Sequence, residues 1–205
     1  MFEKQYRDGV RLYQRVIAGI GWPGSKPGAV CVVGEESGFK APYQHYLLAE
    51  REEADPGEFF KVCVDLEGKF KISGFYSRLD EPSLEYLSQW NRERRESHLS
   101  TLHVSAAPFS DTGSLQYHLS LAKDKLRVHQ KTLHLGESRV SGLLAEIQTG
   151  ELVDIKDAEQ PLIAALCYAA AALVTWEYDG NVPEPEKPYD PLRYGLGGND
   201  YNPFG

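Results

Sequence analysis

The sequence predicts an α/β fold in which helices flank both faces of a mixed sheet. Two short β-branched apolar runs, residues 16–20 and 29–33, are joined by a loop of Gly, Pro, Ser and Lys, as expected of two paired strands. Strand-like and helix-like segments then alternate, and the order ends in a strongly apolar helix expected over residues 157–176. A strand meander followed by helix, strand, helix, strand and helix is typical of a mixed sheet between helical layers.

The remaining elements follow from local patterns. The spacing of apolar residues predicts a lead-in helix over residues 2–15, and the dipeptide Glu67-Gly68 predicts a tight turn between strands at 59–66 and 70–76. Residues 38–57 favour neither strand nor helix. Pro82 suits the first turn of a helix over residues 81–96. Further elements are expected in chain order as a strand at 102–107, a helix from Asp111, a strand at 126–128 and a helix at 138–149.

Length and composition predict one domain with a tail. A chain of 205 residues that is 41% hydrophobic can bury one core, which we assign to residues 1–178. Residues 179–205 are rich in Pro, Gly and Tyr and form an extended tail. The net charge of −8 argues against a surface that holds nucleic acid by bulk electrostatics, although a local basic patch remains possible.

The three cysteines, Cys31, Cys63 and Cys167, lie within apolar runs and form no CxxC pair. The chain starts without a secretory signal, and its longest apolar run, residues 162–174, is too short to cross a membrane. We therefore expect buried, reduced thiols in a cytoplasmic protein with no membrane contact.

Several local segments resemble the nuclease domain of phage large terminases, which has an RNase H-like fold. These segments are the opening strand pair, Leu126-Arg127-Val128-His129, residues 143–147, residues 161–169 and the tail segment 188–194. The resemblance covers residues 16–174. It implies an RNase H-like mixed sheet flanked by helices, and a phage or prophage origin within a bacterial host.

In that family, carboxylates on separate elements hold two divalent metal ions that cleave the phosphodiester bond. The positions that match the family's acids here are Gly21, Ala106 or Ala107, and Ala164, and Gln160 and Pro161 stand one turn before the last of them. None of these residues supplies a carboxylate. The resemblance therefore implies a degenerate, non-cleaving protein that needs no cofactor and acts as a binding or assembly component linked to phage DNA packaging.

An alternative is a metal-dependent DNA endonuclease with a displaced carboxylate site. Asp111, Asp157 and Glu159 are the candidate ligands for Mg²⁺ or Mn²⁺. Each also has a purely structural interpretation, since Asp111 suits a helix N-cap and the other two suit the start of the last helix. Asp65 is expected in a turn and not in a site.

The tail offers a possible contact with a protein partner. Its prolines alternate with aromatic residues, a composition that either stays extended or docks into a groove on a neighbour. Whether the protein also binds nucleic acid is left open by the sequence.

Overall fold

The computed structural model describes residues 5–23, 27–37, 43–79, 81–107, 117, 119–120, 122, 132–141 and 160–173. Within them, seven strands form one mixed sheet in the order β6-β5-β2-β3-β4-β7, and β1 pairs with β2 off this path. The strands are β1 (Tyr6–Arg7), β2 (Leu12–Gly21), β3 (Gly28–Glu36), β4 (His45–Glu53), β5 (Gly74–Ser77), β6 (Val104–Ala106) and β7 (Leu133–His134). The α/β fold class is therefore confirmed.

The sheet has an antiparallel half and a parallel half. Strands β2, β3 and β4 form an antiparallel meander, and β5 lies parallel to β2 on its other side. Strand β6 continues the parallel half, and β7 adds to the far edge parallel to β4. An antiparallel meander is therefore followed by parallel strands that alternate with helices.

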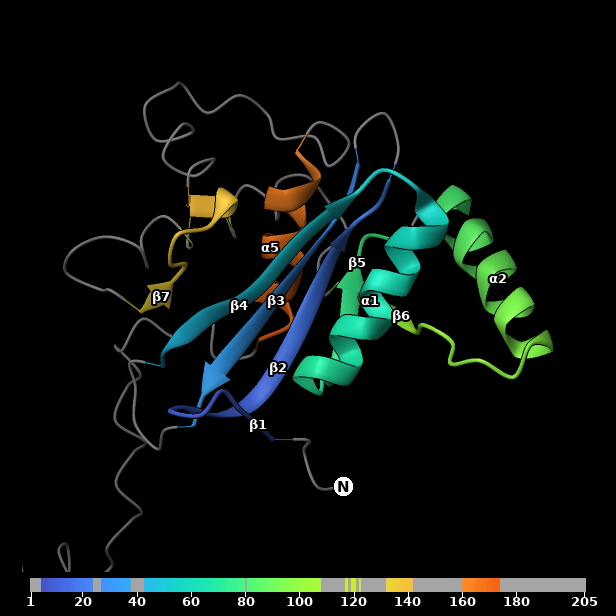
Figure 1. Cartoon of the computed structure of the whole chain (residues 1–205). Coiled ribbons are helices and arrows are strands. Elements are labelled where there is room, and N and C mark those ends of the chain that lie inside the picture. Colours follow the sequence, from blue (N-terminus) through green and yellow to red (C-terminus); the bar gives the residue numbers. More distant parts are fainter. Residues whose placement is uncertain are drawn as a thin grey trace, which may run out of the picture.

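Helices cover both faces of the sheet (Figure 1). Helix α1 (Pro56–Phe70) connects β4 to β5 and helix α2 (Glu81–Glu96) connects β5 to β6, and both lie on one face. Helix α5 (Pro161–Ala171) lies on the other face, against β2 and β3. Alternate residues of the central strands point into separate cores, since Val16 and Ala18 belong to the α1 side and Ile17 and Cys31 to the α5 side.

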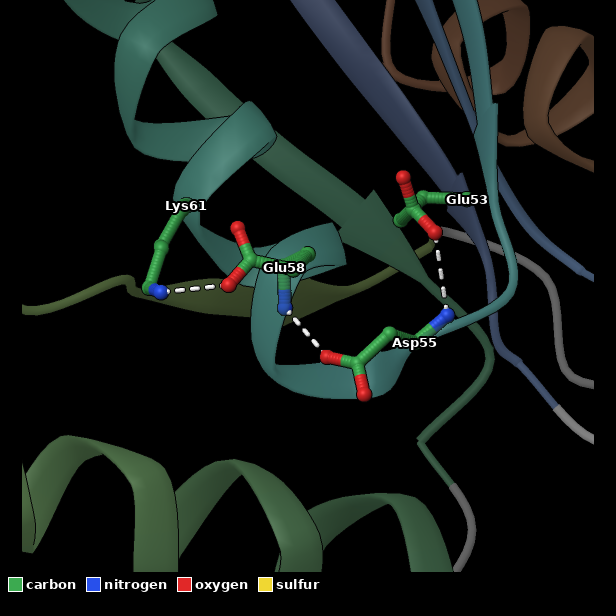
Figure 2. A network of polar contacts seen from close by, with 4 residues as sticks. All are labelled: Glu53, Asp55, Glu58 and Lys61. Atoms are coloured by element: carbon green, nitrogen blue, oxygen red, sulfur yellow. Dashed lines mark hydrogen bonds and ion pairs between the residues drawn. The ribbon is translucent and has the colours of Figure 1, made fainter.

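The predicted hairpin at residues 59–76 is wrong, because residues 56–70 form α1. Asp55 caps this helix, where its Oδ1 accepts a hydrogen bond of 2.8 Å from the backbone N–H of Glu58 (Figure 2). The buried residues Phe59, Phe60, Cys63, Leu66 and Phe70 recur at helical spacing along one face. Gly68 therefore lies inside a helix and not in a turn.

The predicted lead-in helix over residues 2–15 is also wrong. Its described part contains β1 and the start of β2, joined by a turn at Asp8 and Gly9. Asp8 accepts hydrogen bonds from the backbone N–H groups of Val10 and Arg11, and Gly9 has a φ of +91° that favours glycine. The local turn chemistry thus outweighs the helix-like spacing.

Other predicted elements agree with the structure. The strands at residues 16–20 and 29–33 pair as expected, α2 starts at Glu81, and β6 falls within residues 102–107. The last helix is shorter than predicted. Residues 139–141 start the helix expected at 138–149, and the unassigned residues 38–57 contain β4. Of the helix expected from Asp111, residues 117, 119–120 and 122 are described, and they are helical. The strand expected at 126–128 and the tail at 179–205 lie outside the described residues.

Candidate functional site

The candidate site lies at the carboxyl ends of three neighbouring parallel strands. Strand β2 ends at Gly21, β5 ends at Ser77, and Ala107 follows β6. The Ser77 hydroxyl is fully buried and donates a hydrogen bond of 2.6 Å to the backbone oxygen of Ile20. The Ser77 carbonyl in turn accepts a 2.8 Å hydrogen bond from the N–H of Ala107. Backbone and hydroxyl bonds therefore fasten the three strand ends together.

At Gly21, the first position that the resemblance matches to an acid, helix α5 occupies the space where a side chain would lie. A Cβ atom built on Gly21 would overlap the carbonyl oxygen of Pro161 and lie 2.8 Å from the Pro161 carbonyl carbon and Cα. These are backbone atoms in the first turn of α5, so they cannot swing away as a flexible side chain would. The packing leaves no room for a carboxylate at the end of β2.

The contact continues one turn further along the helix. A Cβ on Gly19 would overlap the carbonyl oxygen of Ala165 and lie 2.6 Å from the backbone nitrogen of Ala169. Ala164, another position that the resemblance matches to an acid, lies on α5 and is fully buried in the core between this helix and the sheet. Small residues on both elements thus allow a close helix-to-strand contact where the resemblance implies a metal site.

The second matched position, Ala106 or Ala107, lies at the end of β6, and β5 separates this strand from β2. The side chain nearest in register to the end of β2 comes from Ser77, which the sequence interpretation did not single out. The predicted hairpin ended at residue 76 and so left Ser77 outside its second strand. In the structure, α1 ends at Phe70 and β5 runs from Gly74 to Ser77.

The residues of the strand ends do not fit a pair of divalent metal ions. Gly21, Ser77 and Ala107 supply no carboxylate, and the hydroxyl of Ser77 is already bonded to the β2 backbone. Among the residues that the structure describes, no three His, Cys, Asp or Glu side chains are grouped closely enough to hold a metal ion. Asp65, expected in a turn, instead lies exposed in the middle of α1.

The displaced site proposed from Asp111, Asp157 and Glu159 lies outside the described residues. The structure therefore does not test whether these three carboxylates converge. It does describe Gln160, which directly follows them and precedes the first turn of α5 without a side-chain capping bond.

A second polar cluster lies at the amino end of β2, far along the strand from Gly21. The Tyr13 hydroxyl donates a 2.6 Å hydrogen bond to Asp8, and burial together with this bond raises the pKa of Tyr13 above its usual range. The guanidinium of Arg11 lies 4.5 Å from the ring centre of Tyr46, and the Tyr46 ring also stacks on His134 at 4.3 Å. Burial and the charge of Arg11 lower the pKa of His134. These contacts connect the turn between β1 and β2 to strands β4 and β7.

The three cysteines are reduced and buried, as predicted. Cys31 on β3 directs its Sγ toward the Leu162 carbonyl at 3.5 Å, and burial raises the pKa of its thiol well above the usual range. Burial also raises the pKa of the Cys63 thiol. Such thiols are poor nucleophiles, so their position indicates packing and not catalysis.

The fold and the strand ends define an α/β protein with a mixed sheet whose carboxyl edge is packed by a helix. Comparison of the chain with models of known protein families and with curated proteins gives no match. No helix within the described part of the chain is long and apolar enough to cross a membrane.

Proposed function

We propose that this chain is an RNase H-like protein, related to the nuclease domain of phage terminases, that does not cleave DNA. It acts as a binding or assembly component in a phage-related setting. The proposal combines the local sequence resemblance with the mixed sheet and with the residues found at the strand ends. We also propose that the tail at 179–205 contacts a protein partner.

One observation supports the loss of cleavage most directly. The carboxyl end of β2 is in contact with the backbone of Pro161, so an acidic side chain at position 21 would push α5 away from the sheet. Gly21 therefore lacks a metal-binding side chain and is also required for the contact between β2 and α5. This geometry favours a protein in which the carboxyl end of β2 is part of the core and not of a catalytic site.

A plasmid assay tests this proposal. The purified chain is incubated with supercoiled plasmid and Mg²⁺ or Mn²⁺, and we expect no nicking above that of a buffer control. Isothermal titration with Mn²⁺ alone should show no heat of binding. The variants Asp111→Ala, Asp157→Ala and Glu159→Ala are compared with Asp65→Ala, which removes an exposed carboxylate on α1.

The opposite outcome is equally specific. Metal-dependent nicking that persists in Asp65→Ala and disappears in the three other variants would establish the endonuclease with a displaced site and overturn the proposal. Nicking at the same rate in all four variants would identify a contaminating nuclease.

A further inference from the structure

An aromatic groove lies between the amino-terminal half of α1 and the α2 helix. A pocket of about 160 Å³ is lined by Trp22, Phe60 and Tyr86 together with three prolines, Pro23, Pro56 and Pro82. A second pocket, of about 130 Å³, adjoins it and shares Tyr86, and it is lined also by Gly57, Trp90 and Glu93. We call the two pockets together the α1/α2 groove.

The walls of the groove are held in place by the protein itself. Phe60 makes ring contacts with Trp22, Tyr86 and Trp90, with ring centres 6.1, 5.9 and 5.1 Å apart. The indole N–H of Trp22 donates a 2.7 Å hydrogen bond to the carbonyl of Arg78. The hydrogen bond from the Glu58 N–H to Asp55 fixes the first turn of α1 (Figure 2). This turn contains Pro56 and Gly57. A groove with fixed walls binds without the cost of ordering them.

The lining favours a particular peptide conformation. Aromatic rings and prolines that stay partly exposed, such as Tyr86 at 46%, are the surfaces on which polyproline II segments pack. That conformation is extended and already ordered before binding. The groove therefore fits proline rings better than it fits a helix or a charged headgroup.

One carboxylate of the groove offers a partner for a basic residue in the ligand. Glu93 is the charged side chain among the described residues that line it. It accepts a 3.3 Å hydrogen bond from the Gln89 amide of the same helix, and the Arg94 guanidinium lies 4.7 Å from the ring centre of Trp90. Glu93 follows Tyr86 by seven positions of the same helix, a rise of roughly 10 Å. A polyproline II segment rises about 3.1 Å per residue, so three or four residues cover this distance.

We propose that the α1/α2 groove binds a proline-rich segment of another protein, with a proline packed on Tyr86 and a Lys or Arg three or four residues away paired with Glu93. The inference rests on the proposed binding role and names the partner's chemistry. The chain's own tail also places a Lys four residues from a proline, at Pro183 and Lys187, but Glu184 and Glu186 lie between them and would be repelled by Glu93.

The test uses the full chain and a capped synthetic peptide, Ala-Pro-Pro-Ala-Pro-Ala-Ala-Lys-Ala, titrated by calorimetry and by tryptophan fluorescence. We expect saturable binding that Tyr86→Ala weakens about tenfold, as loss of a central aromatic contact does. Leu84→Ala is the matched control, because Leu84 is similarly exposed on α2 and does not line the groove. Circular dichroism checks that each variant is folded.

The peptide charge separates a specific site from general apolar binding. Replacing the peptide Lys by Ala should weaken binding up to about fivefold in the wild-type chain, the range for an exposed ion pair, and should have no effect in Glu93→Gln. Absence of saturable binding, or an equal loss in Leu84→Ala, would overturn the proposal. Tighter binding of a peptide with the tail sequence 182–193 would overturn it in favour of the chain's own tail. The plasmid assay and the peptide titration measure different properties. Nicking of plasmid would therefore contradict the proposed function and leave the proposal for the α1/α2 groove intact.

Discussion

At the scale of single residues, two glycines of β2 determine how closely α5 approaches the sheet. We expect Gly19→Ala and Gly21→Ala each to lower the free energy of unfolding by about 3 kcal/mol, because the new methyl group would overlap helix backbone. Gly68→Ala is the control. Gly68 lies in α1, and no atom lies within 4 Å of the place that its new methyl group would occupy, so alanine should raise stability by up to about 1 kcal/mol.

Urea unfolding followed by tryptophan fluorescence measures all three variants. Wild-type stability in Gly21→Ala would contradict the contact between β2 and α5. It would also remove the main structural argument against a carboxylate at this strand end.

The same residues show what the sequence can and cannot predict about a site. The resemblance seen in the sequence predicts Gly21 and Ala164 as positions without a ligand, and this stays a prediction. It does not show that Gly21 touches Pro161, because the two residues are 140 positions apart in the chain and only the packed helix brings them together. The role of Ser77 depends in the same way on a strand pairing that no local pattern specifies.

At the scale of elements, one buried amide connects α2 to the segment that enters β6. Asn91 donates a hydrogen bond of 2.8 Å to the Leu102 carbonyl and accepts one of 2.9 Å from the Leu102 N–H. Asn91→Ala would leave both buried backbone groups unpaired, so we expect a loss of about 2–4 kcal/mol in the free energy of unfolding. Ser88→Ala, an exposed change on the same helix, should alter it by less than about 0.5 kcal/mol. Equal effects of the two changes in urea unfolding would show that the bridge contributes no stability.

The error over residues 59–70 comes from reading the segment without its beginning. In residues 59–70, apolar and charged residues alternate enough to suggest a strand, yet the five buried side chains of α1 also fit a helical face. The start of the element distinguishes the two structures, because Asp55 is an N-cap and Pro56 suits the first turn of a helix. Both residues belong to the segment 38–57, to which the sequence analysis assigned no structure. Helix α2 is predictable because Pro82 marks its first turn.

At the scale of the whole molecule, the fold class and the pairing of β2 with β3 were predictable, whereas the complete order of elements and the edges of the sheet were not. Strands β2 and β3 contain long apolar runs, but β4 ends in charged residues and carries no such pattern. Strands β1 and β7 are two residues long and carry too little pattern to be recognised. Strand β1 pairs with β2 across a short turn, whereas β7 pairs with β4 over a long range that no local pattern specifies.

The central strands join the two cores, so we expect the molecule to unfold as one unit, which the three cysteines can report. Cys31 and Cys167 lie in the core under α5, and Cys63 lies in the core under α1. Alternate residues of β2 and β3 belong to both cores, so one helical layer cannot separate while the other remains packed. Variants that each keep one cysteine, with alanine at the other two, are treated with a thiol reagent at increasing urea concentrations. All three thiols should become reactive at the same urea midpoint, which should match that of tryptophan fluorescence. Labelling of Cys63 at a clearly lower concentration than Cys31 and Cys167 would show instead that the layer of α1 opens independently.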